Sequence, residues 1–141
     1  MRAIIVGAVE GTRVAVDAIA RAADWELAAA VTLPPDLASR HSDFVDIAPV
    51  AAAHGAEIIH AANGNAEPVV DRLRALAPDY LFVIGWSQIC RPPMLQAARF
   101  GTIGYHPAPL PRLRGRAVIP WTILLDEPIT AGTLFWIDEG T

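Results

Sequence analysis

The chain has 141 residues, a formal net charge of −4 at pH 7 and a sequence pI of about 5.4. This is the length of one domain, and the acidic balance argues against a general nucleic-acid binder, which needs an excess of Lys and Arg. Cys90 is the only cysteine, so an intramolecular disulfide is excluded and we expect a reduced, cytoplasmic setting. No apolar run approaches the roughly 18 residues of a membrane span, so we expect no membrane contact.

Short apolar runs alternate with longer amphipathic segments, which is the pattern of βαβ units around a parallel sheet. The expected strands cover residues 3–6, 25–32, 56–60, 80–84, 100–105 and 133–137. The expected helices cover residues 12–23, 44–54, 67–77, 92–98 and 117–125. We therefore predict an α/β fold of the Rossmann-like type, an open and mostly parallel sheet with helices on both faces.

The first strand leads through the turn Gly7-Ala-Val-Glu-Gly11 into the first helix. The turn lacks the G-x-G-x-x-G spacing of a dinucleotide site and the Gly-Lys-Ser/Thr of a Walker loop, and Glu10 would repel a phosphate. A plain strand-to-helix turn is the simpler interpretation. On the helix, we expect one face to hold Val14, Ala18 and Ala22, and a more exposed face to hold Arg13, Asp17 and Arg21.

A polar segment follows the second strand. His41, beside Asp43, could form one corner of a metal site, but no second His or Cys stands at ligand spacing, so a solvated loop is the simpler interpretation. Ser42 or Asp43 can cap the helix expected over 44–54. We assign no chemistry to His54, and we expect no metal in the chain.

Residues 80–84 form the most strand-like run, and we expect a central strand that is buried on both faces. The residues from Gly85 to Cys90 then lie at the carboxyl edge of the sheet. Trp86 and Ile89 either pack in the core or line a pocket there. Cys90 is expected to pack rather than react, because no His or cation stands close in sequence to lower its pKa.

The stretch 104–121 stands out because it combines stiff backbone with ionisable side chains. Three prolines fix φ and remove backbone donors, so this is a loop, and they are Pro107, Pro109 and Pro111. Three arginines follow, Arg112, Arg114 and Arg116. The loop places His106 at the carboxyl end of a strand, where ligands bind in open α/β sheets. An imidazole titrates near neutrality, so the pattern indicates proton transfer near an anion; a solvated loop is the alternative.

This stretch resembles the signature loop of the 10-formyltetrahydrofolate-dependent formyltransferases, the family of methionyl-tRNA, glycinamide ribonucleotide and sugar N-formyltransferases. The positions at matching spacing are His106, Leu110, Pro111, Arg114, Gly115 and Arg116. Trp121 stands where several sugar-modifying members carry Trp. Residues 130–140 resemble the family's Thr-Gly-x-Thr strand, which leads to an Asp-x-Gly turn. The similarity therefore spans most of the chain.

The resemblance implies that 10-formyltetrahydrofolate donates a formyl group to a primary amine, without a metal. Protonated His106 would stabilise the tetrahedral oxyanion that forms when the amine attacks. Two residues earlier, the family's catalytic Asn is replaced by Gly104, for which Tyr105 or a backbone amide would have to substitute. The family's catalytic Asp stands one residue beyond Thr141, so we expect residues 1–141 to be a single formyltransferase-like domain without the C-terminal part of longer members.

Further roles follow from the same resemblance. The donor-binding residues would be Trp86, Ser87, Gln88, Ile89, Asp138 and Gly140. The acceptor contacts would be Arg114, Arg116, Tyr105 and Gly11. We expect three segments, 85–89, 106–116 and 138–141, to converge at one edge of the sheet.

Several functional hypotheses follow. The first is a formyltransferase acting on an amino sugar nucleotide, which Trp121 and the acidic balance favour over tRNA. The second is a module that binds folate or a nucleotide sugar without turnover, which Gly104 favours. A methionyl-tRNA formyltransferase-like enzyme is a further alternative, and a full-length form could be a homodimer. An unrelated NAD-binding domain is disfavoured because the glycine fingerprint is absent.

Overall fold

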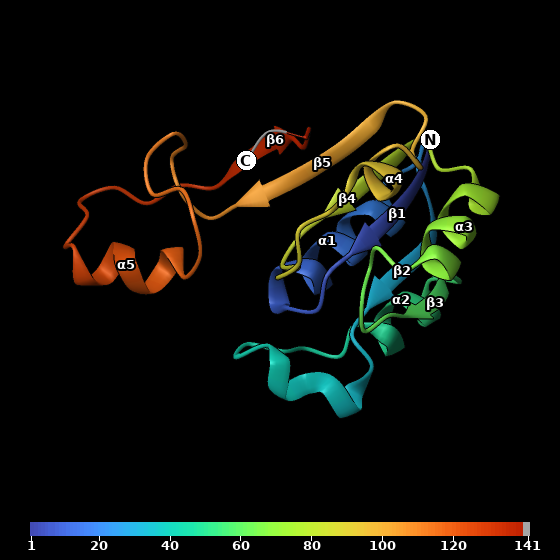
Figure 1. The fold of residues 1–141 in the computed structure, drawn as a ribbon, viewed down its shortest axis with the longest axis horizontal. Coiled ribbons are helices and arrows are strands. Elements are labelled where there is room, and N and C mark those ends of the chain that lie inside the picture. Colours follow the sequence, from blue (N-terminus) through green and yellow to red (C-terminus); the bar gives the residue numbers. More distant parts are fainter. Residues whose placement is uncertain (140–141) are drawn as a thin grey trace.

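The centre of the molecule is a six-stranded sheet, described here for residues 1–139 of a computed structural model (Figure 1). In chain order the strands are β1 (Arg2–Val6), β2 (Glu26–Thr32), β3 (Glu57–His60), β4 (Tyr80–Val83), β5 (Gly101–His106) and β6 (Thr133–Trp136). Their spatial order is β3-β2-β1-β4-β5-β6, and every neighbouring pair is parallel except β5 and β6. The strand order reverses between β1 and β4, which confirms the Rossmann-like prediction.

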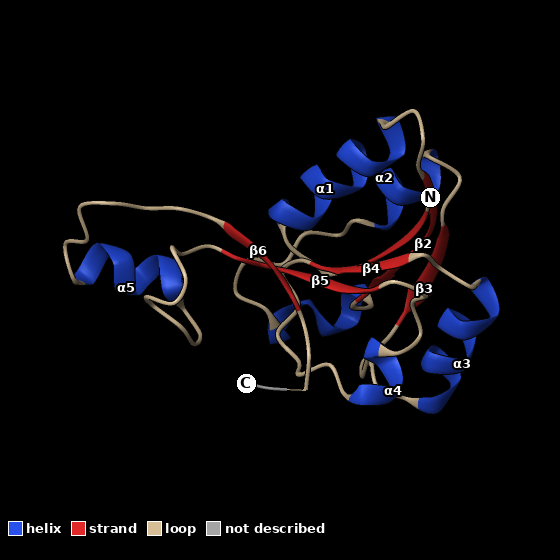
Figure 2. Cartoon of the chain, turned by 90° about the horizontal axis from the view of Figure 1, so that it is seen from above, coloured by secondary structure: helices blue, strands red, loops and turns tan. Residues whose placement is uncertain are grey.

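Helices cover both faces of this sheet. In chain order the helices are α1 (Glu10–Arg21), the 3-10 helix η1 (Pro35–Arg40), α2 (Ala48–Ala53), α3 (Glu67–Leu76), α4 (Pro92–Leu95) and α5 (Val118–Leu124), of which α5 lies away from the sheet. Figure 2 shows α1 and α2 on one face and α3 and α4 on the other. The helix expected from residue 44 begins later because Asp46, not Asp43, accepts a hydrogen bond from the first-turn N–H, that of Ala48. Asp43 instead pairs with His41 at 2.7 Å.

The expected buried face of α1 was wrong. Val14 is 54% exposed, whereas Thr12 and Val16 are fully buried. The hydroxyl of Thr12 donates to the Ile84 carbonyl at 2.5 Å, and Val16 packs in an apolar cluster with Ile5. The hydrogen bond from Thr12 therefore sets the rotation of the helix and turns Val14 toward solvent.

Two apolar cores lie on opposite faces of the sheet because side chains alternate along each strand. Ile4 and Val6 belong to the core beneath α3 and α4, and Ile5 belongs to the core beneath α1 and α2. The expectation that residues 80–84 are buried on both faces holds for one face and only in part for the other, where Ile84 is buried. Leu81 and Val83 are buried, while Tyr80 and Phe82 are half-buried in a group of aromatic rings, with Trp25 centred 5.6 Å from Tyr80.

The segment between β5 and β6, residues 107–132 (hereafter the arm), carries α5 away from the sheet (Figure 1). Arg112 binds the carboxylate of Glu127 at 2.6 Å, so two distant parts of the arm are tied together. Apolar side chains of α5 are exposed, Ile123 by 74% and Trp121 by 52%. Within residues 1–139, no helix has the length and apolar character needed to cross a membrane.

Candidate active site

His106 is the last residue of β5 and lies at the carboxyl edge of the parallel strands. Its ring is half-buried, and Nε2 lies 2.8 Å from the carbonyl oxygen of Leu113 in the arm. Because a carbonyl can only accept, Nε2 must carry the proton in this contact. The hydrogen bond fixes the ring orientation and, in the neutral form, leaves Nδ1 as the basic nitrogen.

Gly104 lies on the same side of β5 as His106, and no side chain could be added there without rearrangement. A Cβ atom on Gly104 would come within 2.7 Å of the Phe135 ring and 3.0 Å of Ile137. Phe135 is the direct cross-strand partner of Gly104. The space that a side-chain donor at position 104 would occupy is therefore filled by an aromatic ring.

Tyr105 points to the opposite face of the strand, because side chains alternate along β5. Its ring lines a cavity of about 370 Å³ formed with Pro107 and the arm residues Ile119, Thr122, Ile123, Thr130 and Ala131. The suggestion that Tyr105 substitutes for the donor missing at Gly104 was wrong, since its hydroxyl lies on the far side of the sheet from Gly104. It remains a candidate for acceptor contact only.

The loop after β4 begins beside His106, because Val83 of β4 is paired with Gly104 of β5. Trp86 is half-buried and packs against the core that contains Met94, so its indole belongs to the core while its Nε1 has no hydrogen-bond partner among residues 1–139. Ser87 and Ile89 are exposed, Ile89 by 74%. Trp86 therefore packs in the core, whereas the core interpretation does not hold for Ile89.

The backbone of this loop is open to hydrogen bonding. Within the described part of the chain, the N–H groups of residues 85–90 donate to no protein acceptor. Burial raises the pKa of the Cys90 thiol to about 11, so the thiol stays protonated at neutral pH. The loop therefore presents backbone donors beside an inert sulfur, in agreement with the expected packing of Cys90.

The expected direction of the last strand was wrong. β6 runs antiparallel to β5, so its first residue, Thr133, is level with His106, and later residues move away from that edge. Asp138 is exposed and follows at the other end of the strand. Gly140 lies outside the described residues. The structure thus brings together the segments that begin at Gly85 and His106, while the strand leading to Asp138 leaves the opposite way.

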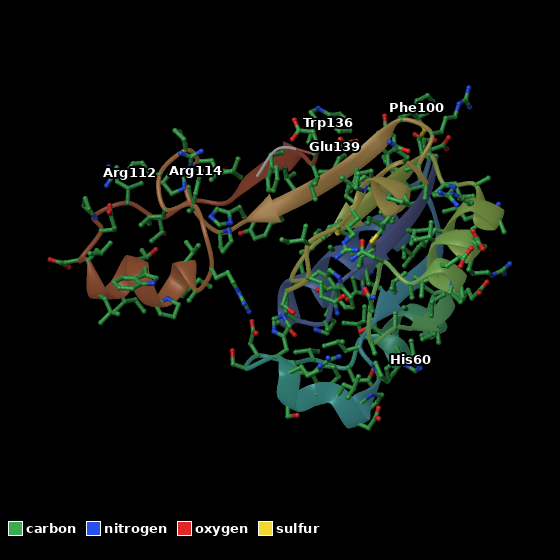
Figure 3. The ribbon with its side chains drawn as sticks, viewed as in Figure 1. His60, Phe100, Arg112, Arg114, Trp136 and Glu139 are labelled. Carbon is green, nitrogen blue, oxygen red and sulfur yellow. The ribbon has the colours of Figure 1, made fainter. Side chains whose placement is uncertain are left out.

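The three arginines of the arm have different surroundings. Arg112 is bound to Glu127. Arg114 and Arg116 are exposed and line a cavity of about 250 Å³, together with Leu113, Val118, Trp121 and Leu125. Figure 3 shows Arg112 and Arg114 on the arm, well separated from His60 at the far side of the sheet. Two guanidinium groups and an indole thus surround one hollow next to the residue that binds His106.

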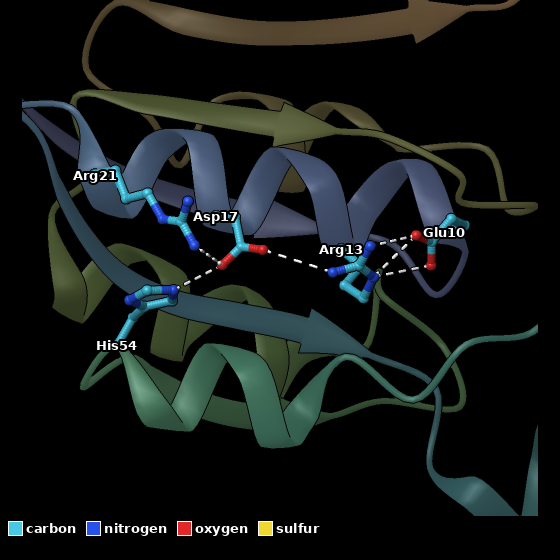
Figure 4. Close-up of polar contacts among 5 residues, drawn as sticks. All are labelled: Glu10, Arg13, Asp17, Arg21 and His54. Atoms are coloured by element: carbon cyan, nitrogen blue, oxygen red, sulfur yellow. Dashed lines mark hydrogen bonds and ion pairs between the residues drawn. The ribbon is translucent and has the colours of Figure 1, made fainter.

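Gly11 is exposed in the first turn of α1, where the charge of Glu10 is paired with that of Arg13. Glu10 binds Arg13 at 2.5 Å, and hydrogen bonding to Arg13 lowers the pKa of Glu10. Farther along, Asp17 accepts a hydrogen bond from Nε2 of His54 at 2.8 Å (Figure 4). These contacts tie α1 to the C-terminal end of α2 and bring no group toward His106. Among residues 1–139, no cluster of three His, Cys, Asp or Glu side chains could hold a metal.

Comparison with known proteins places this geometry in context. A sequence profile described as formyl transferase matches residues 3–141, nearly the whole chain. The chain belongs to the formyl transferase family.

Among curated members of the family, the methionyl-tRNA formyltransferase of Thermobifida fusca strain YX is 34% identical to this chain, over 99% of the chain and 45% of the relative. That of Salinispora arenicola strain CNS-205 is 33% identical to this chain, over 99% of the chain and 46% of the relative. The chain therefore spans about half the length of these relatives. These relatives give no support to the expectation that tRNA is disfavoured as the acceptor.

Solved structures share the fold. A phosphoribosylglycinamide formyltransferase from Bacillus halodurans gives a TM-score of 0.79 at 20% identity, covering 99% of this chain and 73% of that one. A sugar N-formyltransferase from a Shewanella species gives 0.62 at 17% identity, covering 99% of this chain and 52% of that one. At these identities the likeness concerns the fold.

Some residues that shape the candidate site were missed by sequence reasoning. Thr133 donates to the Ala108 carbonyl at 2.6 Å and accepts from the Leu110 N–H, which fastens the proline loop to β6. Phe135 fills the space beside Gly104. A glycine in a strand is a signal for such a close approach, but it does not name the neighbour. The carbonyl of Leu113 gives no sequence signal, since it is a backbone group.

Proposed function

We propose that this chain transfers a formyl group from 10-formyltetrahydrofolate to a primary amine at the edge formed by His106 and the loop that begins at Gly85. The observation that carries the proposal is the hydrogen bond from Nε2 of His106 to Leu113, together with the family membership of the chain. The ring is oriented by a fixed backbone acceptor, as a group that handles protons must be. Its Nδ1 has no protein partner among residues 1–139.

The residues present fit a folate donor. The N–H groups of residues 85–90 have no acceptor within the described chain, and a pterin ring carries a fixed pattern of acceptors and donors. The donor would supply the formyl group. We propose that the backbone of Trp86, Ser87, Gln88 and Ile89 binds the ring.

His106 would transfer protons during the reaction. In its neutral form Nδ1 can accept a proton from the acceptor ammonium, which leaves the free amine that attacks the formyl carbon. The protonated ring can then donate to the oxygen on which negative charge develops, and the folate nitrogen gains a proton as it leaves. Gly104 contributes no side-chain donor, so the oxyanion relies on His106 and backbone N–H groups. Loss of one such donor costs about 100- to 1000-fold in rate in other enzymes, so we expect slow turnover.

For the acceptor we propose an amino sugar nucleotide. The cavity formed by Arg114, Arg116 and Trp121 offers two guanidinium groups with no carboxylate partner among residues 1–139 and an exposed indole. Guanidinium groups bind phosphate, and an indole stacks on a planar base. Tyr105 and Gly11 would contact the sugar portion.

A methionyl-tRNA acceptor is the second candidate, favoured by the curated relatives. The same arginines would then contact the phosphate backbone. Since each neutralised phosphate releases counterions, binding of tRNA would weaken steeply with salt, whereas a small nucleotide makes few such contacts.

The test is to incubate the chain with 10-formyltetrahydrofolate and either acceptor, and to detect the formylated product by mass spectrometry. We expect product with the amino sugar nucleotide, loss of product in His106→Ala, and no effect of His60→Ala, a matched change at an exposed histidine. Donor binding without product from any amine would instead identify the chain as a folate-binding module. Product from methionyl-tRNA alone would replace the first acceptor by the second.

A further inference from the structure

Two side-chain amides join the loop after β4 to the turn that precedes α3. Oε1 of Gln88 accepts from the Gly64 N–H at 3.1 Å, and Nε2 of Gln88 donates to the Ala62 carbonyl at 2.9 Å. From the turn to the loop, Nδ2 of Asn65 donates to the Ile89 carbonyl at 2.8 Å. Oδ1 of the same amide accepts from the Arg91 N–H at 2.7 Å.

Each amide uses one donor and one acceptor on the backbone of the other segment, so its orientation is determined. Rotating the Asn65 amide by a half turn would place its NH₂ group against the Arg91 N–H and its oxygen against the Ile89 carbonyl, losing both bonds. An aspartate at 65 could serve the Arg91 N–H alone. The role therefore requires the amide, not polarity in general.

The two segments are also packed. Gly64 is buried, and a Cβ atom there would lie 3.3 Å from the indole of Trp86 and 3.5 Å from Met94. The turn thus sits directly on the ring that anchors the loop in the core. Packing fixes the base of the loop and the amides fix its outer part, from Gln88 to Arg91.

This arrangement has a consequence for the open backbone of the loop. In a strand or helix, N–H groups are held in place by bonding to other backbone groups, which leaves them unavailable to ligands. Here, residues 85–90 keep their N–H groups open within the described chain. Side chains from the neighbouring turn supply part of the constraint instead, through the Ile89 carbonyl and the Arg91 N–H.

We infer that Asn65 is a positioning residue that, with Gln88, holds the loop 85–91 in the shape that presents its backbone N–H groups to a ligand. The ligand is the folate donor if the proposed function holds, on which this part of the inference rests. Asn65 itself need not touch the donor. Its effect passes through the backbone at Ile89 and Arg91.

The test compares Asn65→Ala and Gln88→Ala with two controls, Asn63→Ala and Gln96→Ala. Gln96 is an exposed amide outside the loop, and Asn63 accepts one bond from the Asn65 N–H within the turn. Amide hydrogen exchange of Gly64 and Arg91, whose N–H groups donate to Gln88 and Asn65, reports the loop, and calorimetric titration with 5-formyltetrahydrofolate, a stable folate, reports binding. If Asn65 holds the loop, exchange of the Gly64 N–H, which donates to Gln88, should be faster by about tenfold or more in Asn65→Ala, and folate affinity should be lower by about the same factor.

The two readouts separate the inference from the proposed function. Unchanged exchange of the Gly64 N–H in Asn65→Ala would overturn the positioning role, whatever the folate result. Faster exchange with unchanged folate affinity would overturn the link to the ligand. Absence of folate binding by the wild-type chain would overturn the donor site, while the exchange data still decide whether the amides hold the loop. Asn65→Asp, which keeps the acceptor for Arg91, is expected to lie between wild type and Asn65→Ala and serves as the second variant if the alanine change prevents folding.

Discussion

Single contacts decide what this site can do, and Gly104 is the clearest case. The sequence shows only that a side-chain donor is absent two residues before His106. The structure adds that Phe135 and Ile137 occupy the position from which such a donor would act. The absence is therefore not an empty place that a substitution could simply fill. Gly104 and Phe135 behave as one packing unit across two strands.

Gly104→Asn alone is expected to destabilise the chain by about 1–3 kcal/mol, because it overpacks a filled site. Combining it with Phe135→Ala should recover much of this loss, giving a coupling free energy of about 0.5–3 kcal/mol in a double-mutant cycle. Urea unfolding of the four chains measures it. If the proposed function holds, the double variant should also transfer formyl groups faster than wild type. Additive effects on unfolding would contradict the paired packing.

At the scale of elements, the charged groups on α1 act between helices rather than at the site. Asp17 accepts a hydrogen bond from His54, which lies at the end of α2, and it is also close to Arg13 and Arg21 (Figure 4). The hydrogen bond from His54 is the main reason that the pKa of Asp17 is lowered from 3.8. Sequence reasoning gave His54 no role because its partner is 37 residues away.

A lowered pKa means that the Asp17 carboxylate stabilises the folded state above its ordinary pKa, and that this contribution is lost as pH falls through the lower folded value. We therefore expect Asp17→Asn to be less stable than wild type at neutral pH and the difference to shrink below about pH 4. Thermal unfolding between pH 7 and pH 3 measures it. A difference that stays constant over this range would exclude the pairing as its source. Asp71→Asn, in an exposed pair within α3, is the matched control.

Prediction from the sequence succeeded for some helices and strands and failed for others, for physical reasons. Periodicity located the first five strands because each is a short apolar run bounded by Gly, Pro or polar residues. It could not give the direction of β6, because an antiparallel edge strand has the same local pattern as a parallel one. The rotation of α1 was missed because it depends on a hydrogen bond from Thr12 to Ile84, 72 residues away. His106 and the loop 85–91 were placed at one edge correctly, since parallel neighbouring strands end together.

For the molecule as a whole, stability resides in the sheet and its two covering layers, not in the arm. Leu81 is fully buried at the centre, whereas Ile123 on α5 is 74% exposed. The two residues have similar side chains and opposite surroundings. The free energy of unfolding should therefore respond very differently to changes at these positions.

Leu81→Ala is expected to cost about 2–5 kcal/mol, because it removes packing contacts and leaves a cavity. Ile123→Ala should change the free energy of unfolding by less than about 0.5 kcal/mol, as is usual for an exposed position. Chemical unfolding of both variants with a common denaturant checks the contrast. A large loss for Ile123→Ala would mean that α5 is buried in solution, which would contradict its position in Figure 1.

The hydrogen bond between His106 and Leu113 makes the protonated nitrogen of the imidazole depend on the position of the arm. While it is intact, the proton on Nε2 is held by the arm and only Nδ1 can exchange protons with a neighbour. If an incoming molecule draws the arm aside, either nitrogen can carry the proton, and the ring can change tautomer or turn. The position of the arm thus determines which ring nitrogen of His106 can exchange protons. The nitrogen chemical shifts of His106 would report whether the arm is in contact with the ring.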